Sequence, residues 1–209
     1  MSDPRRRHWE QVYRSKSSEE VSWFQSEPAE SLRLIRAAGV GLDAPIIDVG
    51  GGASVLIDRL LDAGFRCTAV LDVCAQALAT SRARLGGRAA QVEWLEADVT
   101  AFRPPHGYAL WHDRAVFHFL TEPDDRNRYK TALRRALLPD GQVVIATFAV
   151  GGPARCSGLD IVQYDARRMQ TELGDDFVLE EVAREVHVTP AGKEQKFEYF
   201  RLRRTISGS

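Results

Sequence analysis

A run of apolar residues that leads into an acid and three glycines constrains this chain more than any other stretch. Residues 46–54 read Ile-Ile-Asp-Val-Gly-Gly-Gly-Ala-Ser. The β-branched Ile46, Ile47 and Val49 suit a buried strand, and glycines allow a sharp turn in which backbone amides approach a ligand. Residues 53–63 then show the apolar spacing of a helix. A strand, a glycine turn and a helix in this order predict half of a nucleotide-binding site.

The acid in front of the glycines, Asp48, narrows the kind of ligand. A carboxylate at the end of a strand repels phosphate groups but accepts hydrogen bonds from an ammonium group or from hydroxyls. The pattern therefore disfavours a pyrophosphate ligand, and with it a nicotinamide-dependent oxidoreductase. It favours a nucleotide-like ligand that carries an amino acid.

Composition excludes several other classes. A chain of 209 residues is long enough for one domain with a substantial core, and its net charge of −1 gives no reason to expect a nucleic-acid partner. No apolar run approaches the ~18 residues that span a bilayer, and no apolar segment follows the N-terminal arginines as in a secretory signal. Arg5, Arg6 and Arg7 are interpreted as a solvated helix face.

The cysteines and the alternation of elements indicate the type of protein and its fold. Cysteines 67, 74 and 156 have no metal-like spacing, so we expect reduced thiols in a cytoplasmic protein. Helical and extended patterns alternate along most of the chain. The expected helices are 5–14, 28–38, 53–63, 75–85, 125–137 and 165–173, and the expected parallel strands are 45–49, 66–71, 91–95, 108–112 and 142–148.

The C-terminal part departs from this alternation. Residues 177–189 and 194–204 are both extended and alternating, and the segment 190–193 contains the Pro and Gly of a hairpin connection. We therefore predict an α/β fold with a doubly wound, mostly parallel seven-stranded sheet and helices on both faces. The sheet is expected to finish in an antiparallel hairpin with one reversed edge strand.

Acids follow four of the expected strands: Asp48, Asp72, Asp98 and Asp113. Ligands of open α/β sheets bind outside the carboxyl ends of the strands, so these side chains are candidate ligand contacts. Asp72 lies 24 residues after Asp48, close to the spacing of about 20 residues that is typical of an acid bound to ribose hydroxyls. A carboxylate can accept two hydroxyl donors at once.

These residues resemble the motifs of class I methyltransferases that use S-adenosylmethionine. The acid and alternating glycines of the family match Asp48, Gly50 and Gly52, and Ser54 stands where a third glycine is common. In the turn before the fifth strand, Asp140 replaces a frequent glycine. The resemblance covers residues 8 to 204 and implies S-adenosylmethionine as cofactor and S-adenosylhomocysteine as product. The residues it assigns to cofactor binding are Trp9, Tyr13, Asp48, Gly50, Gly51, Gly52, Asp72, Val73, Asp98, Val99 and Asp113.

Each assignment has a simpler structural alternative. An Asp at the end of a strand often caps the next helix, which applies to the first three acids. Asp113 could instead pair with His112 or Arg114. In the resembling enzymes an N-terminal Trp and Tyr close over the cofactor, but Trp9 and Trp23 could equally fix the first helix to the sheet.

Candidates for proton transfer from an acceptor are His112, His118 and Asp113, which surround the end of the fourth strand. General bases of this kind contribute about 10²–10⁴-fold to a rate. His187 in the hairpin is a weaker candidate. The histidines at 106, 112 and 118 recur every six residues, which fits no compact metal motif, so no metal is expected. A nucleophilic role for Cys156 is not needed, and we expect its loop, 151–158, to cover the acceptor.

The acceptor is the least constrained part of the prediction. Relatives that methylate protein lysines carry a second Asp five residues after the one that follows strand four, and here His118 takes that place. An aromatic mouth of Trp23, Phe117 and Phe119 beside His118 favours a small acceptor, such as a thiol or another soft nucleophile. A protein lysine methyltransferase is the alternative, and a non-catalytic cofactor-binding or interaction protein is a weaker one.

We expect residues 1–209 to form a single methyltransferase domain. Within it, 1–40 is the N-terminal helical lid, 41–150 the cofactor-binding core, and 151–209 the loop, helix and C-terminal hairpin. The expected partner is a small-molecule acceptor, with a protein substrate possible and with neither nucleic acid nor membrane. Oligomeric state and acceptor atom stay open at this point.

Overall fold

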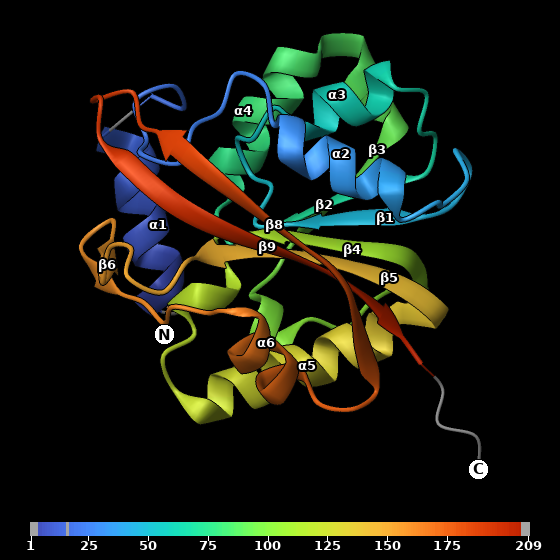
Figure 1. Cartoon of the computed structure of the whole chain (residues 1–209). Coiled ribbons are helices and arrows are strands. Elements are labelled where there is room, and N and C mark those ends of the chain that lie inside the picture. Colours follow the sequence, from blue (N-terminus) through green and yellow to red (C-terminus); the bar gives the residue numbers. More distant parts are fainter. Residues whose placement is uncertain (1–3, 16, 206–209) are drawn as a thin grey trace.

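The computed structural model describes residues 4–15 and 17–205. Residues 1–3, 16 and 206–209, which the expected single domain includes, lie outside the described part. Seven strands form one sheet in the order β3-β2-β1-β4-β5-β9-β8 (Figure 1). Their bounds are β1 Ile46–Val49, β2 Thr68–Asp72, β3 Val92–Glu96, β4 Tyr108–Arg114, β5 Leu137–Phe148, β8 Phe177–Val188 and β9 Glu194–Arg204.

The chain order reverses at β1, which pairs in parallel with β2 on one side and with β4 on the other. All residues of β1 and β2 are buried, as expected for central strands covered on both faces. The reversal places the carboxyl ends of β1, β2 and β4 around one crevice, where an open α/β sheet binds its ligand. The predicted doubly wound fold is confirmed.

The C-terminal hairpin joins the sheet with its second strand inside. β9 is antiparallel to both β5 and β8, so the reversed strand is not the edge strand that we predicted; β8 is the edge. Every residue of β9 from Phe197 to Phe200 is buried, whereas β8 alternates between more and less exposed positions. The interior strand thus buries the large aromatic residues Phe197, Tyr199 and Phe200, whereas the edge strand β8 leaves several valines exposed.

Helices cover both faces of the sheet (Figure 1). The helices α2 (Ala29–Ala37), α3 (Leu56–Asp62) and α4 (Ala75–Leu85) lie on one face, and α5 (Pro123–Ala136) and α6 (Ala166–Leu173) lie on the other. The first helix, α1 (Pro4–Ser15), stands apart from these layers and contacts α4. Three short 3₁₀ turns complete the helical elements: η1 Gly86–Gln91, η2 Val99–Ala101 and η3 Phe117–Phe119.

Two local features differ from the prediction. The expected turn at 139–141 lies inside β5: Leu137 pairs with Tyr108 and Gln142 with Leu110, so residues 138–141 loop out opposite a single residue. The expected loop after β5 contains a small separate sheet of β6 (Arg155–Cys156) and β7 (Leu159–Asp160). The alternation of apolar and polar residues in the sequence reveals neither the irregularity within β5 nor the two-residue strands β6 and β7.

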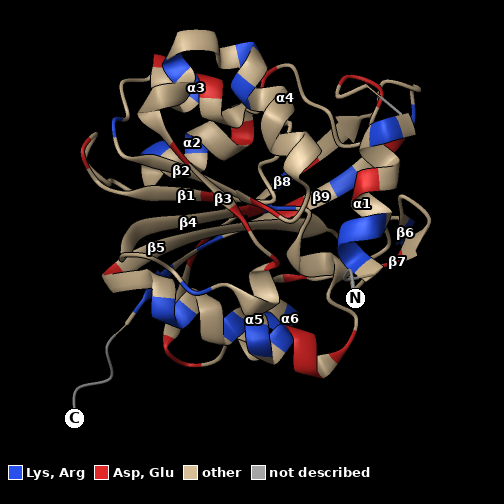
Figure 2. Cartoon of the chain, turned by 180° about the vertical axis from the view of Figure 1, so that it is seen from behind, with Lys and Arg blue, Asp and Glu red and all other residues tan. Residues whose placement is uncertain are grey.

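Basic and acidic side chains are mixed on α1, α3 and α5 (Figure 2), in keeping with the net charge of −1. Among the described helices, none is both long and apolar enough to cross a membrane.

Candidate functional site

The turn after β1 brings glycines against side chains from other elements. Gly50 has a φ of +70°, and a Cβ at this position would lie 2.1 Å from Val116 Cγ2. A Cβ on Gly52 would lie 2.4 Å from Asp72 Oδ2. Since real Cβ atoms do not approach other atoms so closely, any other residue would displace Val116 at position 50 or Asp72 at position 52. The turn therefore keeps its backbone close to the end of β2.

Asp48, at the end of β1, is buried, and His112 of the neighbouring strand β4 holds it in place. Nδ1 of His112 lies 2.7 Å from Asp48 Oδ1, and Nε2 lies 2.9 Å from Ser31 Oγ on α2. A Cβ on Gly51 would lie 2.3 Å from Asp48 Oδ2. Both ring nitrogens of His112 thus have partners within the protein. This corrects the expectation that His112 takes a proton from an acceptor, because the ring orients Asp48 instead.

Asp72, at the end of β2, is a buried carboxyl group. Its Oδ1 accepts a hydrogen bond of 2.8 Å from the backbone N–H of Cys74. Burial first, and the charge of Asp48 in addition, raise the pKa of Asp72 to about 7, against the lowering effect of the Cys74 hydrogen bond. A ligand that donates hydroxyl hydrogens to this group would favour its charged form.

Asp98, which follows β3, accepts hydrogen bonds from two neighbours. Its Oδ1 accepts from the backbone N–H of Thr100 at 2.7 Å, which caps the η2 turn, and its Oδ2 accepts from Arg5 Nη1 at 2.9 Å. Arg5 also forms an ion pair with Asp125 on α5. The expectation that Arg5 belongs to a solvated helix face is therefore wrong, because its ion pairs fix α1 to two elements of the core.

These strand ends surround a cavity of about 790 Å³, its open mouth included. A second hollow of about 560 Å³ adjoins it at the glycine turn and is lined by Asp48, Gly51, His112 and Ser31 among others. Expected cofactor residues that line the main cavity are Trp9, Tyr13, Gly50, Asp72, Val73, Asp98 and Val99.

An aromatic cluster from the N-terminal segment forms one wall of the cavity. Trp9 contacts Trp23 with ring centroids 5.6 Å apart and Phe119 with centroids 5.1 Å apart, both edge to face. Tyr13 contacts Trp23 at 6.2 Å in the same manner. Trp9 and Tyr13 also pack against the buried cluster of Ala53, Cys74 and Ala77. The two interpretations of these aromatics hold together, because the rings that fix α1 to the sheet also line the cavity.

Asp113 does not reach the cavity. It is fully buried on the other face of the sheet, where Oδ2 accepts from Tyr129 Oη at 2.6 Å and Oδ1 accepts from Val116 N at 2.9 Å. Burial raises the pKa of Asp113 to about 6, although the bond from Tyr129 lowers it. The structure thus corrects both roles expected for Asp113, cofactor contact and catalysis. Its hydrogen bonds instead fix the turn that follows β4.

His118 and His187 also have structural surroundings. His118 is fully buried, its Nδ1 accepts from Phe148 N at 3.3 Å, and it is not among the residues that line the cavity. Burial, with the charge of Arg114 in addition, lowers the pKa of His118 to about 3. Nε2 of His187 lies 2.8 Å from the carbonyl oxygen of Ser22. The structure therefore does not place His118 where it could accept a proton from a substrate.

Other expectations concern metal and sulfur chemistry. In residues 4–15 and 17–205, no group of three or more His, Cys, Asp or Glu side chains is arranged to hold a metal ion. The three cysteines are free thiols, and burial raises the pKa of Cys156. Cys156 is nevertheless part of the cavity wall, as expected for the segment after β5.

Two charged residues of the cavity wall were not predicted as site residues, Arg5 and Arg114. Arg114 was considered only as an ion-pair partner of its neighbour Asp113. The available signal was its place in β4: side chains alternate along a strand, so His112 and Arg114 share the face opposite to Asp113. Arg5 had no such signal, because α1 joins the site only through tertiary contacts.

Comparisons with known proteins agree with this geometry. Residues 46–141 match the profile of the methyltransferase domain family. A solved SAM-dependent methyltransferase from Anabaena variabilis has a TM-score of 0.74 at 16% identity, over 97% of this chain and 96% of its own. A 1,6-didemethyltoxoflavin-N1-methyltransferase from Burkholderia thailandensis, solved with that compound and S-adenosylhomocysteine, has a TM-score of 0.68 at 18% identity, over 96% and 84% of the two chains. Residues 46–141 thus match a methyltransferase domain, and the chain as a whole shares the fold of these S-adenosylmethionine-dependent methyltransferases.

A third structure is described as the conversion of a disulfide bond into a thioacetal group during echinomycin biosynthesis. It has a TM-score of 0.77 at 16% identity and covers 98% of this chain and 93% of its own. No curated protein shows significant sequence similarity. The matched family region, residues 46–141, contains the methyltransferase glycine turn and the ends of β1 to β4. The lid and hairpin lie outside this region, but the solved structures named here cover 96–98% of the chain.

Proposed function

We propose that this enzyme transfers the methyl group of S-adenosylmethionine to a small-molecule acceptor. The observation that carries the proposal is the cavity itself: the acids at the ends of β2 and β3 line one part of it, and an apolar and aromatic wall lines the rest. A polar half for the donor and a largely apolar half for an acceptor are what a two-substrate transfer requires.

The residues present fit the cofactor. Asp72 is a buried acceptor beside a turn that excludes any Cβ, which suits ribose hydroxyls. Asp98 and Val99 suit the amino group and ring of adenine, and Asp48, held by His112, suits the ammonium group of the methionine part. When bound, S-adenosylmethionine supplies a methyl group on a cationic sulfur, and the acceptor–carbon bond forms as the carbon–sulfur bond breaks and its electron pair returns to sulfur.

The contribution of the protein is positioning. Orienting two reactants can supply roughly 7–11 kcal/mol of barrier reduction. Trp9 and Tyr13 cover the cavity from α1 and exclude water, and Arg5 fixes α1 through Asp98 and Asp125. We therefore assign residues 1–40 the role of a lid over the core formed by 41–150.

No side-chain base is required by this proposal. His112 and Asp113 are engaged within the protein, and His118 lies outside the cavity wall. An acceptor that is already deprotonated, such as a thiolate that has given its proton to water, needs only to be held in line and loses no proton during the transfer. This supports a soft nucleophile as acceptor and gives no support to a lysine, whose ammonium group would need a base.

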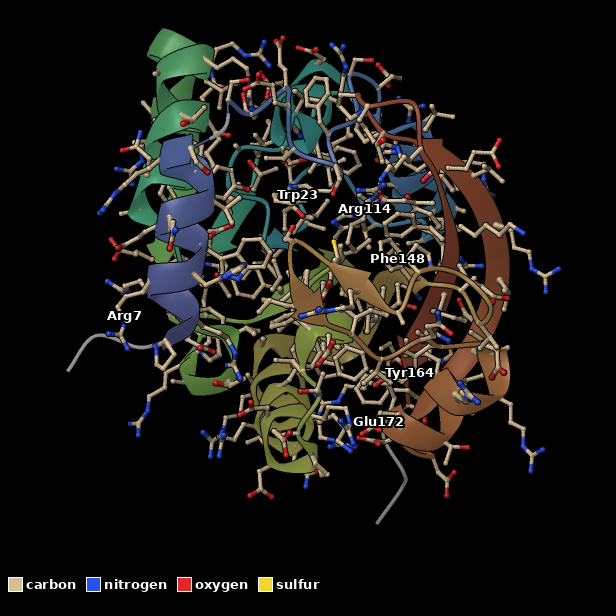
Figure 3. All side chains as sticks on the ribbon, turned by 90° about the vertical axis from the view of Figure 1, so that its left-hand side faces the viewer. Arg7, Trp23, Arg114, Phe148, Tyr164 and Glu172 are labelled. Carbon is tan, nitrogen blue, oxygen red and sulfur yellow. The ribbon has the colours of Figure 1, made fainter. Side chains whose placement is uncertain are left out.

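The residues that enclose the cavity support a small acceptor. Trp23 lies on its wall beside Arg114 (Figure 3), and Cys156 of β6 lines it as well. Segments from both ends of the chain thus surround the space in which an acceptor would lie. The free thiols at positions 67, 74 and 156 further support a cytoplasmic location.

Two measurements test the proposal. S-adenosylhomocysteine should raise the melting temperature of the purified protein, whereas NAD should not; the reverse result would exclude the methyltransferase mechanism. Labelled S-adenosylmethionine is then incubated with the enzyme and with separate small-molecule and protein fractions of a cell extract. Label that enters only the protein fraction would contradict a small-molecule acceptor.

A further inference from the structure

Arg114 is a buried cation whose guanidinium group is only partly used by the protein. Its side chain is 10% exposed. Nε donates to Tyr199 Oη at 3.0 Å and Nη1 donates to the Trp23 carbonyl at 3.1 Å, while buried Nη2 has no hydrogen-bond partner in the described part of the chain. Since guanidinium offers five N–H donors in a planar fork, an unused nitrogen in a buried position calls for an acceptor.

The charge of Arg114 is only partly balanced. The nearest carboxylate oxygen is Oε2 of Glu185, 3.7 Å from Nη2, which is beyond hydrogen-bond distance. Glu185 already accepts from Gln25 Nε2 and from Tyr199 Oη, each at 2.8 Å. The guanidinium also lies 4.3 Å over the ring of Phe197. This arrangement keeps a cation buried without giving its outer nitrogen a carboxylate of its own.

Arg114 lines the cavity among residues that cannot satisfy it. The neighbouring wall consists of side chains such as Trp23, Val116, Phe119 and Cys156. The other basic residue of the wall, Arg5, is paired with Asp98 and Asp125. Arg114 is therefore a basic residue of the cavity wall that still has a nitrogen without a hydrogen-bond partner.

We propose that Arg114 binds a carboxylate of the methyl acceptor, so that the acceptor is a small, apolar organic acid. A carboxylate can accept from the guanidinium in a directional manner that neutral groups do not match. The inference rests on the proposed function, because it assumes that a second substrate occupies this half of the cavity.

The surroundings of Arg114 favour the acceptor over the cofactor as the source of the carboxylate. Its contacts come from the 17–28 segment and from β8 and β9, through Trp23, Glu185 and Tyr199. These elements differ from the strands that carry Asp72 and Asp98, while Arg114 also lines the second hollow with Asp48 and Gly51, so the test below includes the carboxylate of the cofactor. The same cation would also lower the pKa of an acceptor thiol or hydroxyl placed near it.

Matched probes test this assignment for each possible acceptor atom. Anthranilate, salicylate and 2-mercaptobenzoate place nitrogen, oxygen or sulfur next to a carboxylate, and their amides have nearly the same shape without the charge. Dissociation constants are measured by calorimetry on protein saturated with S-adenosylhomocysteine. At least one acid should bind about tenfold more tightly than its amide, as a charge-assisted hydrogen bond allows.

Variants separate recognition from folding. Arg114→Gln should reduce the preference for acid over amide to less than about threefold, and Arg114→Lys should retain part of it. Glu185→Gln removes the competing negative charge and should tighten binding of the acid, a gain that misfolding cannot produce. Arg184→Gln, an exposed arginine of β8 with a side chain 82% accessible, is the matched control and should change nothing.

Each outcome decides the proposal. Equal binding of acids and amides, a preference that survives Arg114→Gln, or no binding of any of the six probes would overturn it. A loss of S-adenosylhomocysteine affinity in Arg114→Gln would also overturn it, by assigning the residue to the carboxylate of the cofactor. If the unmodified protein does not bind S-adenosylhomocysteine, the proposed function fails as well, so the two failures are distinguishable.

Discussion

The ends of β1, β2 and β3 present Asp48, Asp72 and Asp98 from connections of a few residues, whereas the end of β4 is completed by distant parts of the chain. Arg114 bonds to Trp23, 91 residues away, and to Tyr199, 85 residues away. The proposed donor side is thus built from local βα turns, and the proposed acceptor side from the lid and the hairpin. This difference explains why the residues of the proposed donor side could be predicted from their spacing in the sequence, whereas those of the acceptor side could not. The position of each donor-side acid is set by the connection between one strand and the next helix. The acceptor side depends on how distant parts of the chain pack together.

The strongest test of the donor side is Gly52→Ala. A Cβ at this position would lie 2.4 Å from Asp72 Oδ2 and 2.8 Å from Ala77 Cβ, so the acid must move. We expect S-adenosylhomocysteine affinity to fall by about 100-fold, or roughly 2.7 kcal/mol, and overpacking to cost about 1–3 kcal/mol of stability. Gly87→Ala is the matched control, because a Cβ there meets nothing within 4 Å. Affinity within a few-fold of the unchanged protein would remove the turn from the site.

The next effect in size concerns Asp72→Asn. Loss of the charged acceptor should weaken S-adenosylhomocysteine binding by more than about tenfold. The same change should stabilise the ligand-free protein at pH 8, because burial raises the pKa of Asp72 from 3.8 to about 7. In the unchanged protein, the protonated Asp72 costs no stability below pH 3.8, and stability is lost as the pH rises from there through about 7. The variant does not ionise, so its gain in stability over the unchanged protein grows across this pH range.

Thermal unfolding at pH 4 and pH 8, together with calorimetry, checks the Asp72 prediction. A domain of this size shifts by roughly 2–4 °C for each kcal/mol. Asp62→Asn, an exposed acid on α3, is the control and should show neither effect. A variant that binds S-adenosylhomocysteine normally would show that Asp72 only caps α4.

The smallest expected effect is on the acceptor side, at His118. His118→Asn should leave kcat within about threefold, since a true general base contributes about 10²–10⁴-fold. With a pKa lowered to about 3 by burial, His118 stays neutral throughout the range from pH 5 to pH 9 and should add no inflection there. The pH profile of kcat decides the matter, with the exposed His106→Asn as control. A lost inflection together with a 100-fold drop would restore His118 as the base.

The local elements were predictable because their signals are local. The helix expected at 75–85 is observed with these bounds, and the hairpin expected from two alternating segments is present as β8 and β9. The position of β9 inside the sheet was not predictable, since alternation states that a strand pairs but not with which partner. The same limit applies to residues 138–141, which loop out of β5.

The site shows the same division at the level of single residues. Asp72 and Gly52 meet because parallel neighbouring strands end at one edge, which the order of the elements implies. His112, Asp113 and Arg114 are consecutive, yet the pleat sends the middle one to Tyr129 and the other two to the opposite face. Their roles therefore could not be assigned from proximity in the sequence.

The fold class and the acids that we assign to the donor could be read from the sequence, because each depends on short spacings within a strand, a turn and a helix. Only the tertiary structure decided that Arg5 fixes α1 to the core, that His112 bonds to Asp48 and that Arg114, a residue of the cavity wall, has a buried nitrogen without a partner. These contacts depend on which elements pack together, and burial then sets the charge and hydrogen-bond needs of each side chain.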